Sequence, residues 1–203
     1  LEQPTPSFSA QLRMLVINPY WNVPARIARE ELLPLQRRDP RYFATHNFQV
    51  LDLRSGEQID PAPVDWTRID ADSFGFRLRQ EPGPKNSLGQ LSFVLPNPFE
   101  IFLHDTPEKA LFARDTRTFS HGCIRIEHPV ALAQYALRGL EGWDEARIRG
   151  EIDSLQQTTL NLPEPIPVYV LYLTSWVDDA GLVNFRDDVY GREDVLAGYF
   201  PDR

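Results

Sequence analysis

One stretch of the chain, residues 104–125, limits fold and chemistry more than any other. A short apolar run at residues 101–103 leads into His104, which predicts a buried strand that ends at a histidine. The stretch closes on Ser120-His121-Gly122-Cys123-Ile124-Arg125, which holds the only cysteine of the chain. If these residues act together, the fold must bring the cysteine back to the end of that strand.

The thiol of Cys123 is a candidate nucleophile. A cysteine attacks as its thiolate, and a free thiol with a pKa of about 8.5 is only slightly ionised at neutral pH. It therefore needs a base or a cation beside it. His121 is near in sequence, but sequence proximity alone does not place its side chain beside the thiol. His104, at a strand end that faces the cysteine, has the better geometry for a general base.

The spacing and the flanks of these residues resemble the L,D-transpeptidases, the family of the YkuD domain. The family signature is a histidine followed at a set distance by Ser/Thr-His-Gly-Cys, and here fifteen residues separate His104 from Ser120. Residues 18–24, 101–107 and 112–117 resemble the long-insert branch of Gram-negative bacteria, which carries a substrate-capping insertion. The resemblance covers about residues 15–185.

The resemblance implies a two-step acyl transfer through a thioester on Cys123. His104 is expected to take the thiol proton, while its other ring nitrogen donates to the backbone carbonyl of Asp105. The Asp105 side chain is a further catalytic candidate. The backbone N–H groups of Gly122 and Cys123 could face the oxyanion.

Other side chains are candidates for supporting roles. His121 and Ser120 are expected to orient the loop around the nucleophile. Arg125 could hold a substrate carboxylate, pair with an acidic neighbour, or support the thiolate. The aromatic residues that could line a substrate groove are Phe102, Trp21 and Tyr20, although such side chains usually belong to the core.

The resemblance also names partners and a location. Donor and acceptor stem peptides of peptidoglycan would be joined by 3-3 cross-links, and β-lactams of the carbapenem type would acylate the cysteine. It implies the Gram-negative periplasm, with targeting or anchoring parts upstream. Two alternatives stay open: hydrolysis at the same site by an L,D-carboxypeptidase or endopeptidase, and a non-catalytic wall-binding module.

A metal hydrolase is a third alternative, because His104, His121 and Cys123 could supply three ligands. No second cysteine and no His-x-x-x-His pattern accompanies them, so we predict neither a metal nor another cofactor. The net charge of −8 and the isoelectric point of about 5.0 argue against nucleic acid as a partner. We expect a monomer.

The order of predicted elements favours one β-rich α+β domain over residues 1–203, with a mixed sheet or sandwich and flanking helices. An insertion at about residues 24–80 is too long for a plain loop and predicts a mainly helical capping subdomain. Within it, Pro34 is expected to end or kink the first helix, and residues 48–53 to form an edge strand. Other expected elements are an irregular start at 1–11, strands at 12–17, 74–78, 90–95, 100–103, 166–177 and 182–185, and helices at 39–45, 127–139, 144–157 and 194–200. Asp144 is the expected N-cap of the helix at 144–157, and a turn at 178–181 is expected to join the last two strands in a hairpin.

Overall fold

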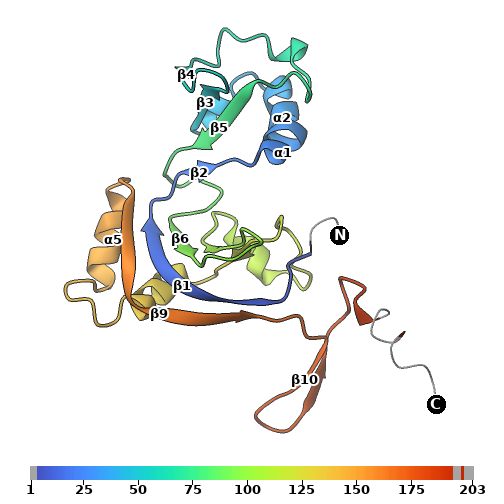
Figure 1. Ribbon diagram of the computed structural model, residues 1–203, viewed down its shortest axis with the longest axis vertical. Helices are drawn as coiled ribbons and strands as arrows, with labels where there is room; N and C mark the ends of the chain where they lie inside the picture. The colour runs from blue at the N-terminus through green and yellow to red at the C-terminus, as the bar shows by residue number, and fades with distance from the viewer. Residues whose placement is uncertain (1–3, 194–197, 199–203) are drawn as a thin grey trace.

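A mixed sheet of five strands forms the larger part of the protein (Figure 1). The computed structural model describes residues 4–193 and 198, so the helical turn expected at 194–200 lies, apart from residue 198, outside the described residues. The strand order is β8-β7-β6-β1-β9, with only the β7–β8 pair parallel. Their bounds are β1 (Phe8–Ile17), β6 (Leu91–Val94), β7 (Leu103–His104), β8 (Ile124–Arg125) and β9 (Thr158–Val170). This arrangement confirms the expected β-rich α+β class.

Alternating apolar side chains hold this sheet to two helices. Leu15 and Ile17 of β1 and Phe93 of β6 are fully buried in one cluster with residues of α4 (Pro129–Ala136) and α5 (Glu145–Asp153). The Asp144 carboxylate accepts a hydrogen bond of 2.8 Å from the Arg147 N–H, which confirms the predicted N-cap of α5.

Strand β9 starts earlier than predicted and ends earlier, at Val170. It contains Pro163, Pro165 and Pro167, whose alternation leaves their missing N–H groups along one edge of the strand. Pro163 and Pro165 lie where the register between β1 and β9 shifts, between Asn161 and Ile166, so neither has a partner residue on β1. A separate hairpin, β10 (Ser175–Val177) with β11 (Val183–Phe185), follows as the sequence indicated.

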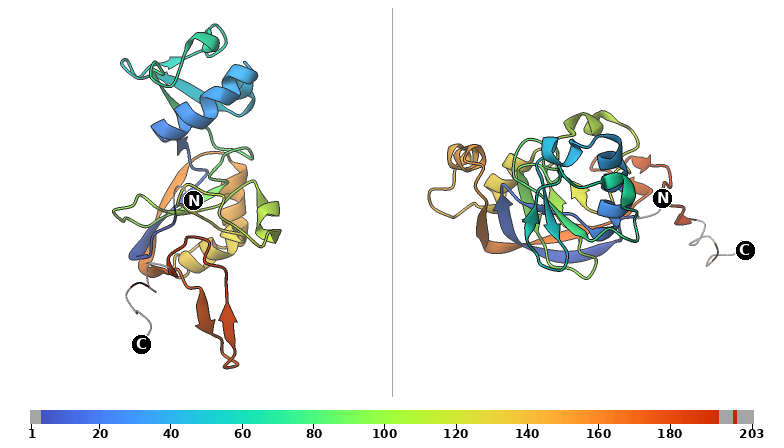
Figure 2. Two further views of the ribbon diagram at one scale, coloured as in Figure 1. Left: turned by 90° about the vertical axis from the view of Figure 1, so that its right-hand side faces the viewer. Right: turned by 90° about the horizontal axis from the view of Figure 1, so that it is seen from above.

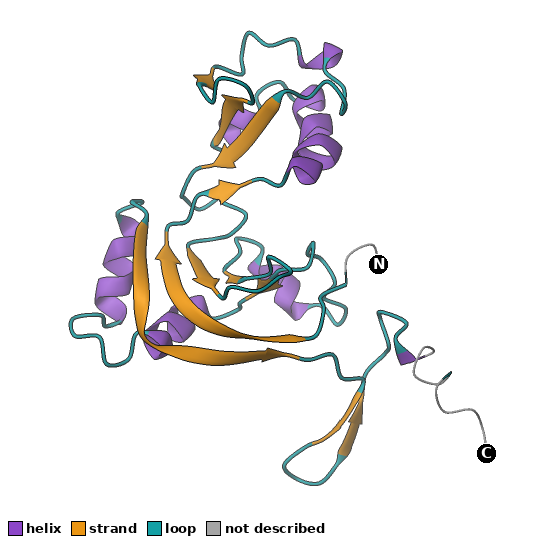
Figure 3. Cartoon of the chain, in the orientation of Figure 1, coloured by secondary structure: helices purple, strands orange, loops and turns teal. Residues whose placement is uncertain are grey.

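The insertion is a second unit at one end of the molecule (Figure 2). Beside its helices it contains a four-stranded antiparallel sheet in the order β2-β5-β3-β4, drawn in orange in Figure 3. The strands are β2 (Trp21–Asn22), β3 (Phe48–Asp52), β4 (Gln58–Ile59) and β5 (Phe76–Gln80). The prediction of β3 as an edge strand was wrong, because the short β4 pairs with its outer side.

The first helix of the insertion continues past Pro34, so the proline does not end it. It runs as α1 (Ala25–Ile27), the π-helical η1 (Ala28–Leu32) and α2 (Leu33–Arg38). The Leu33 N–H bonds the Ala28 carbonyl five residues back, so the helix is already wide where proline offers no N–H. The remaining short helices are α3 (Tyr42–Thr45), η2 (Trp66–Arg68) and η3 (Lys109–Ala113).

Gly89 is required by a close approach to Asp105. Its φ is +62°, and a Cβ built there would lie 2.4 Å from the Asp105 carboxyl carbon. Gly139 has a φ of +87° with nothing within 4 Å of such a Cβ, which makes it a matched control. We expect Gly139→Ala to lower the free energy of unfolding by about 1–2 kcal/mol through backbone strain. Gly89→Ala should cost about 1–3 kcal/mol more through overpacking.

Urea denaturation of both variants measures this difference. Equal losses would contradict the close contact between Gly89 and Asp105, since only backbone strain is common to the two positions.

Candidate active site

The parallel pairing of β7 with β8 brings the predicted histidine and cysteine together. Leu103 is opposite Ile124 and His104 is opposite Arg125. Leu103 and Ile124 pack into the hydrophobic core. Because side chains alternate along a strand, His104 and Arg125 face the other side, and Cys123, directly before Ile124, shares that side.

His104 is held as a buried imidazole with one defined tautomer. His104 is only 5% exposed, and its Nδ1 lies 2.5 Å from the Asp105 carbonyl oxygen. A carbonyl can only accept, so Nδ1 carries the proton and Nε2 is left as the basic nitrogen. Burial lowers the pKa of His104, and the Arg125 cation lowers it further, while the backbone carbonyls of Asp105 and Leu88 and the charge of the Asp105 carboxylate raise it.

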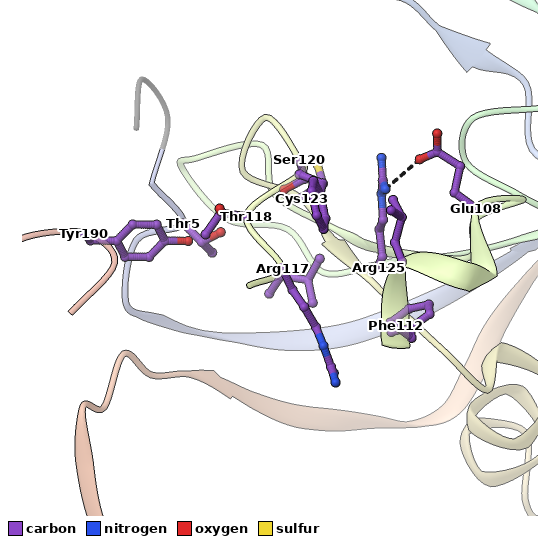
Figure 4. Close-up of a pocket in the computed structure, with 12 residues that line it drawn as sticks. Thr5, Glu108, Phe112, Arg117, Thr118, Ser120, Cys123, Arg125 and Tyr190 are labelled. Carbon is purple, nitrogen blue, oxygen red and sulfur yellow. Dashed lines mark hydrogen bonds and ion pairs between the residues drawn. The ribbon is translucent and has the colours of Figure 1, made fainter. Parts of the chain in front are cut away.

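Cys123 is half-buried and opens onto a pocket of about 280 Å³ (Figure 4). Burial raises the pKa of its thiol, and the backbone N–H of Phe102 partly offsets this rise. The other residues that line the pocket are Thr5, Glu108, Leu111, Phe112, Arg117, Thr118, Phe119, Ser120, Ile124, Arg125 and Tyr190. His104 is absent from this lining.

The two pKa shifts together define the resting protonation state. A raised thiol pKa keeps the proton on sulfur, and a lowered imidazole pKa keeps His104 neutral near pH 7. The pair therefore suits general-base catalysis, in which the imidazole takes the thiol proton as sulfur attacks.

The backbone N–H groups of Gly122 and Cys123 differ in their hydrogen bonding. The Gly122 N–H donates to the Ser120 hydroxyl at 3.2 Å, whereas the Cys123 N–H bonds no other described residue. Gly122 has a φ of +114°, a conformation that side chains disfavour. Of the two donors predicted from the sequence, Cys123 N–H is thus the one available to an oxyanion.

The sequence of this chain is similar to those of known proteins. Residues 2–149 match the family model of the YkuD L,D-transpeptidase catalytic domain. The chain belongs to the YkuD family. A Haemophilus influenzae protein named "Putative L,D-transpeptidase" is 38% identical over 187 residues, which make up 92% of this chain and 37% of that protein. The chain therefore spans little more than a third of that relative's length.

In this YkuD domain the Asp105 side chain holds a loop and does not reach the pocket lining. Its Oδ2 accepts from the Gln90 N–H at 2.9 Å, and Lys109 Nζ lies 2.6 Å from Oδ1. Only its backbone carbonyl contacts the imidazole. Asp105 is therefore positioned to orient His104 through the main chain.

His121 links the nucleophile loop to the insertion. Its Nε2 donates to the Glu31 carboxylate of η1 at 2.8 Å. Arg125, in turn, donates to Glu108 at 2.8 Å, so it pairs with an acidic neighbour. Neither Glu31 nor Glu108 was predicted, because each lies in a charged segment where nothing in the pattern marks one carboxylate.

The predicted aromatic residues take different places. Phe102 packs beside His104, with ring centroids 5.7 Å apart. Trp21 packs against the insertion's own core, and Tyr20 lies under the Arg79 guanidinium at 4.7 Å. Neither Trp21 nor Tyr20 lines the pocket, because the chain leaves the main sheet at Asn18 and enters the insertion there.

No cluster of three or more histidine, cysteine or acidic residues in the described part of the chain could hold a metal ion. Across residues 4–193 and 198, no helix has the length and apolar character to cross a bilayer.

The pH dependence of thiol alkylation tests the neutral pair. Because the thiol pKa is raised, we expect the rate of Cys123 alkylation by iodoacetamide to keep rising beyond the ordinary thiol value of about 8.5. A substitution His104→Gln should leave this profile nearly unchanged, since a neutral imidazole does not stabilise a thiolate. Intact mass measured across a pH series gives the rates, and an inflection near neutrality that disappears in His104→Gln would contradict the assignment.

Proposed function

We propose that this YkuD domain is a peptidoglycan L,D-transpeptidase that forms 3-3 cross-links through a thioester on Cys123. One observation carries the proposal: a buried imidazole of fixed tautomer and a half-buried thiol share one face of two adjacent parallel strands. The family match and the relative named for the same activity support it.

The first half-reaction cleaves the donor stem. His104 Nε2 takes the thiol proton while sulfur attacks the carbonyl carbon of the L-centre in a tetrapeptide stem. The Cys123 N–H faces the negative oxygen of the tetrahedral intermediate. The C–N bond to the terminal D-residue then breaks, and His104 returns the proton to the leaving amine.

The second half-reaction uses the same residues in reverse. An amine of an acceptor stem attacks the thioester, and His104 accepts its proton. The C–S bond breaks, an amide joins two diamino acid residues, and the thiol is restored. Water in place of the amine would give hydrolysis, so the acceptor alone separates transpeptidation from carboxypeptidase action.

We further propose that the insertion caps the bound stem peptide in the periplasm. No insertion residue lines the pocket in the described part of the chain, and the Glu31–His121 hydrogen bond supports its coupling to the nucleophile loop. Because His121 lies two residues before Cys123, a movement of the insertion would change the position of the loop that carries the thiol.

Glu31→Gln tests the coupling of the insertion to the loop. It removes the charge that His121 contacts while preserving side-chain size. We expect the KM for the stem peptide to rise roughly two- to five-fold, the range of an exposed charge pair. Glu30→Gln is the matched control, because Glu30 pairs with Arg26 on its own helix. Equal steady-state kinetics in both variants would contradict the coupling.

Product analysis tests the reaction itself. We expect the protein to convert a purified disaccharide-tetrapeptide into a cross-linked dimer with release of the terminal D-residue, measured by mass spectrometry. Cys123→Ala should abolish the reaction, since without the thiol no thioester forms. Tripeptide without dimer would instead identify an L,D-carboxypeptidase.

Three controls accompany that assay. A chelator should leave the rate unchanged and a thiol-alkylating reagent should abolish it; the reverse result would favour a metal hydrolase. An unchanged rate in Cys123→Ala would remove the thioester mechanism. A mass increase with a carbapenem, absent in Cys123→Ala, would report acylation of the thiol directly.

A further inference from the structure

The pocket beside Cys123 is completed by a part of the chain that the family match does not include. The match ends at residue 149, yet Tyr190 lines the pocket together with Thr5 from the start of the chain (Figure 4). Both segments lie far from the motif in sequence. The fold nevertheless brings both of them to the pocket beside Cys123.

A chain of two hydrogen bonds connects these segments to the nucleophile loop. Arg192 Nη2 donates to the Thr5 carbonyl at 2.9 Å, and the Thr5 hydroxyl donates to the Gly122 carbonyl at 3.1 Å. The second bond is the important one, because the Gly122 carbonyl belongs to the same peptide group as the Cys123 N–H.

That shared peptide group fixes the direction of the Cys123 N–H. The peptide is planar and trans, so its C=O and N–H point in opposite directions. When Thr5 holds the Gly122 oxygen on one side, the Cys123 N–H is aimed at the other. Donation to the carbonyl also polarises the peptide and strengthens the N–H as a donor.

The C-terminal segment that contains Arg192 is held by several contacts of its own. The Asp188 carboxylate accepts from the Tyr172 hydroxyl at 2.5 Å and from the Glu193 N–H at 2.6 Å. These bonds hold the pKa of Asp188 at about 2, so the anchor stays ionised at neutral pH. The Tyr172 and Tyr190 rings lie 4.8 Å apart, and the Arg192 guanidinium lies about 5 Å from each.

We propose that Thr5 is a positioning residue that aims the Cys123 N–H at the oxyanion, and that Arg192 holds Thr5 in place. This inference rests on one part of the proposed function: the Cys123 sulfur attacks a carbonyl group, and the Cys123 N–H donates to the oxygen of that group. It applies to any acyl donor that enters the pocket.

Two reactions of the same thiol separate this role from general disorder of the loop. Acylation by a nitrophenyl ester passes through an oxyanion, whereas alkylation by iodoacetamide displaces iodide and forms none. We expect Thr5→Val to slow ester acylation roughly ten-fold, less than the loss of a whole oxyanion donor. Alkylation should keep its wild-type rate, and Thr5→Ser, which retains the hydroxyl, should recover most of the acylation rate.

Variants of the arginine test the second bond. Arg192→Met should slow acylation in the same direction, and its effect should not add to that of Thr5→Val, because both act through one chain of bonds. Arg186→Met is the matched control, since Arg186 stacks on Trp176 in the β10–β11 hairpin and should leave acylation unchanged.

Equal acylation by Thr5→Val and the wild type would overturn the proposal. So would an equal slowing of acylation and alkylation, or a Thr5→Ser variant as slow as Thr5→Val. If the wild type produces neither dimer nor tripeptide from the tetrapeptide, the proposed function fails, while the ester and iodoacetamide rates still decide the role of Thr5.

Discussion

Two backbone hydrogen bonds, from Ile124 to Phe102 and from Ile126 to His104, join the strand that ends in the imidazole to the segment that carries the thiol. They create the parallel β7–β8 pair, and with it the register that turns His104 and Cys123 to one face. A slip of one residue would turn one of them into the core, because side chains alternate. This short pair is continuous with the antiparallel strands β6, β1 and β9. The helices α4 and α5 pack on the sheet in one hydrophobic core.

Burial then sets the chemistry of the pair. Loss of solvent raises the pKa of the Cys123 thiol and lowers that of His104, so both groups are neutral at rest. The Asp105 carbonyl accepts from Nδ1 and so fixes which ring nitrogen carries the proton in the neutral imidazole. In the proposed mechanism, the Cys123 N–H is the backbone donor that would meet the negative charge that develops during attack.

Two distant segments bond the loop at residues 120–123 directly, and a third acts on it through one of them. The insertion reaches His121 through Glu31, the start of the chain reaches the Gly122 carbonyl through Thr5, and the C-terminal segment reaches Thr5 through Arg192. The loop carries a glycine at a φ of +114° and makes few backbone bonds of its own. Its conformation consequently depends on contacts supplied by the rest of the chain, which is where the reactivity of the thiol can be tuned.

The sequence alone determined the family, the β-rich class, the N-cap at Asp144 and the histidine and cysteine of the motif, because each is recorded in local spacing and periodicity. It misplaced the bounds of β9 and did not show that the helix continues past Pro34, since the effect of a proline depends on whether the surrounding backbone already lacks a partner for its missing N–H. Only the tertiary structure decided that Tyr20 and Trp21 leave the site and that Thr5, Glu31 and Arg192 reach it. Arg192 and Thr5 are 187 positions apart, and a contact over that distance depends on the packing of all the elements between them.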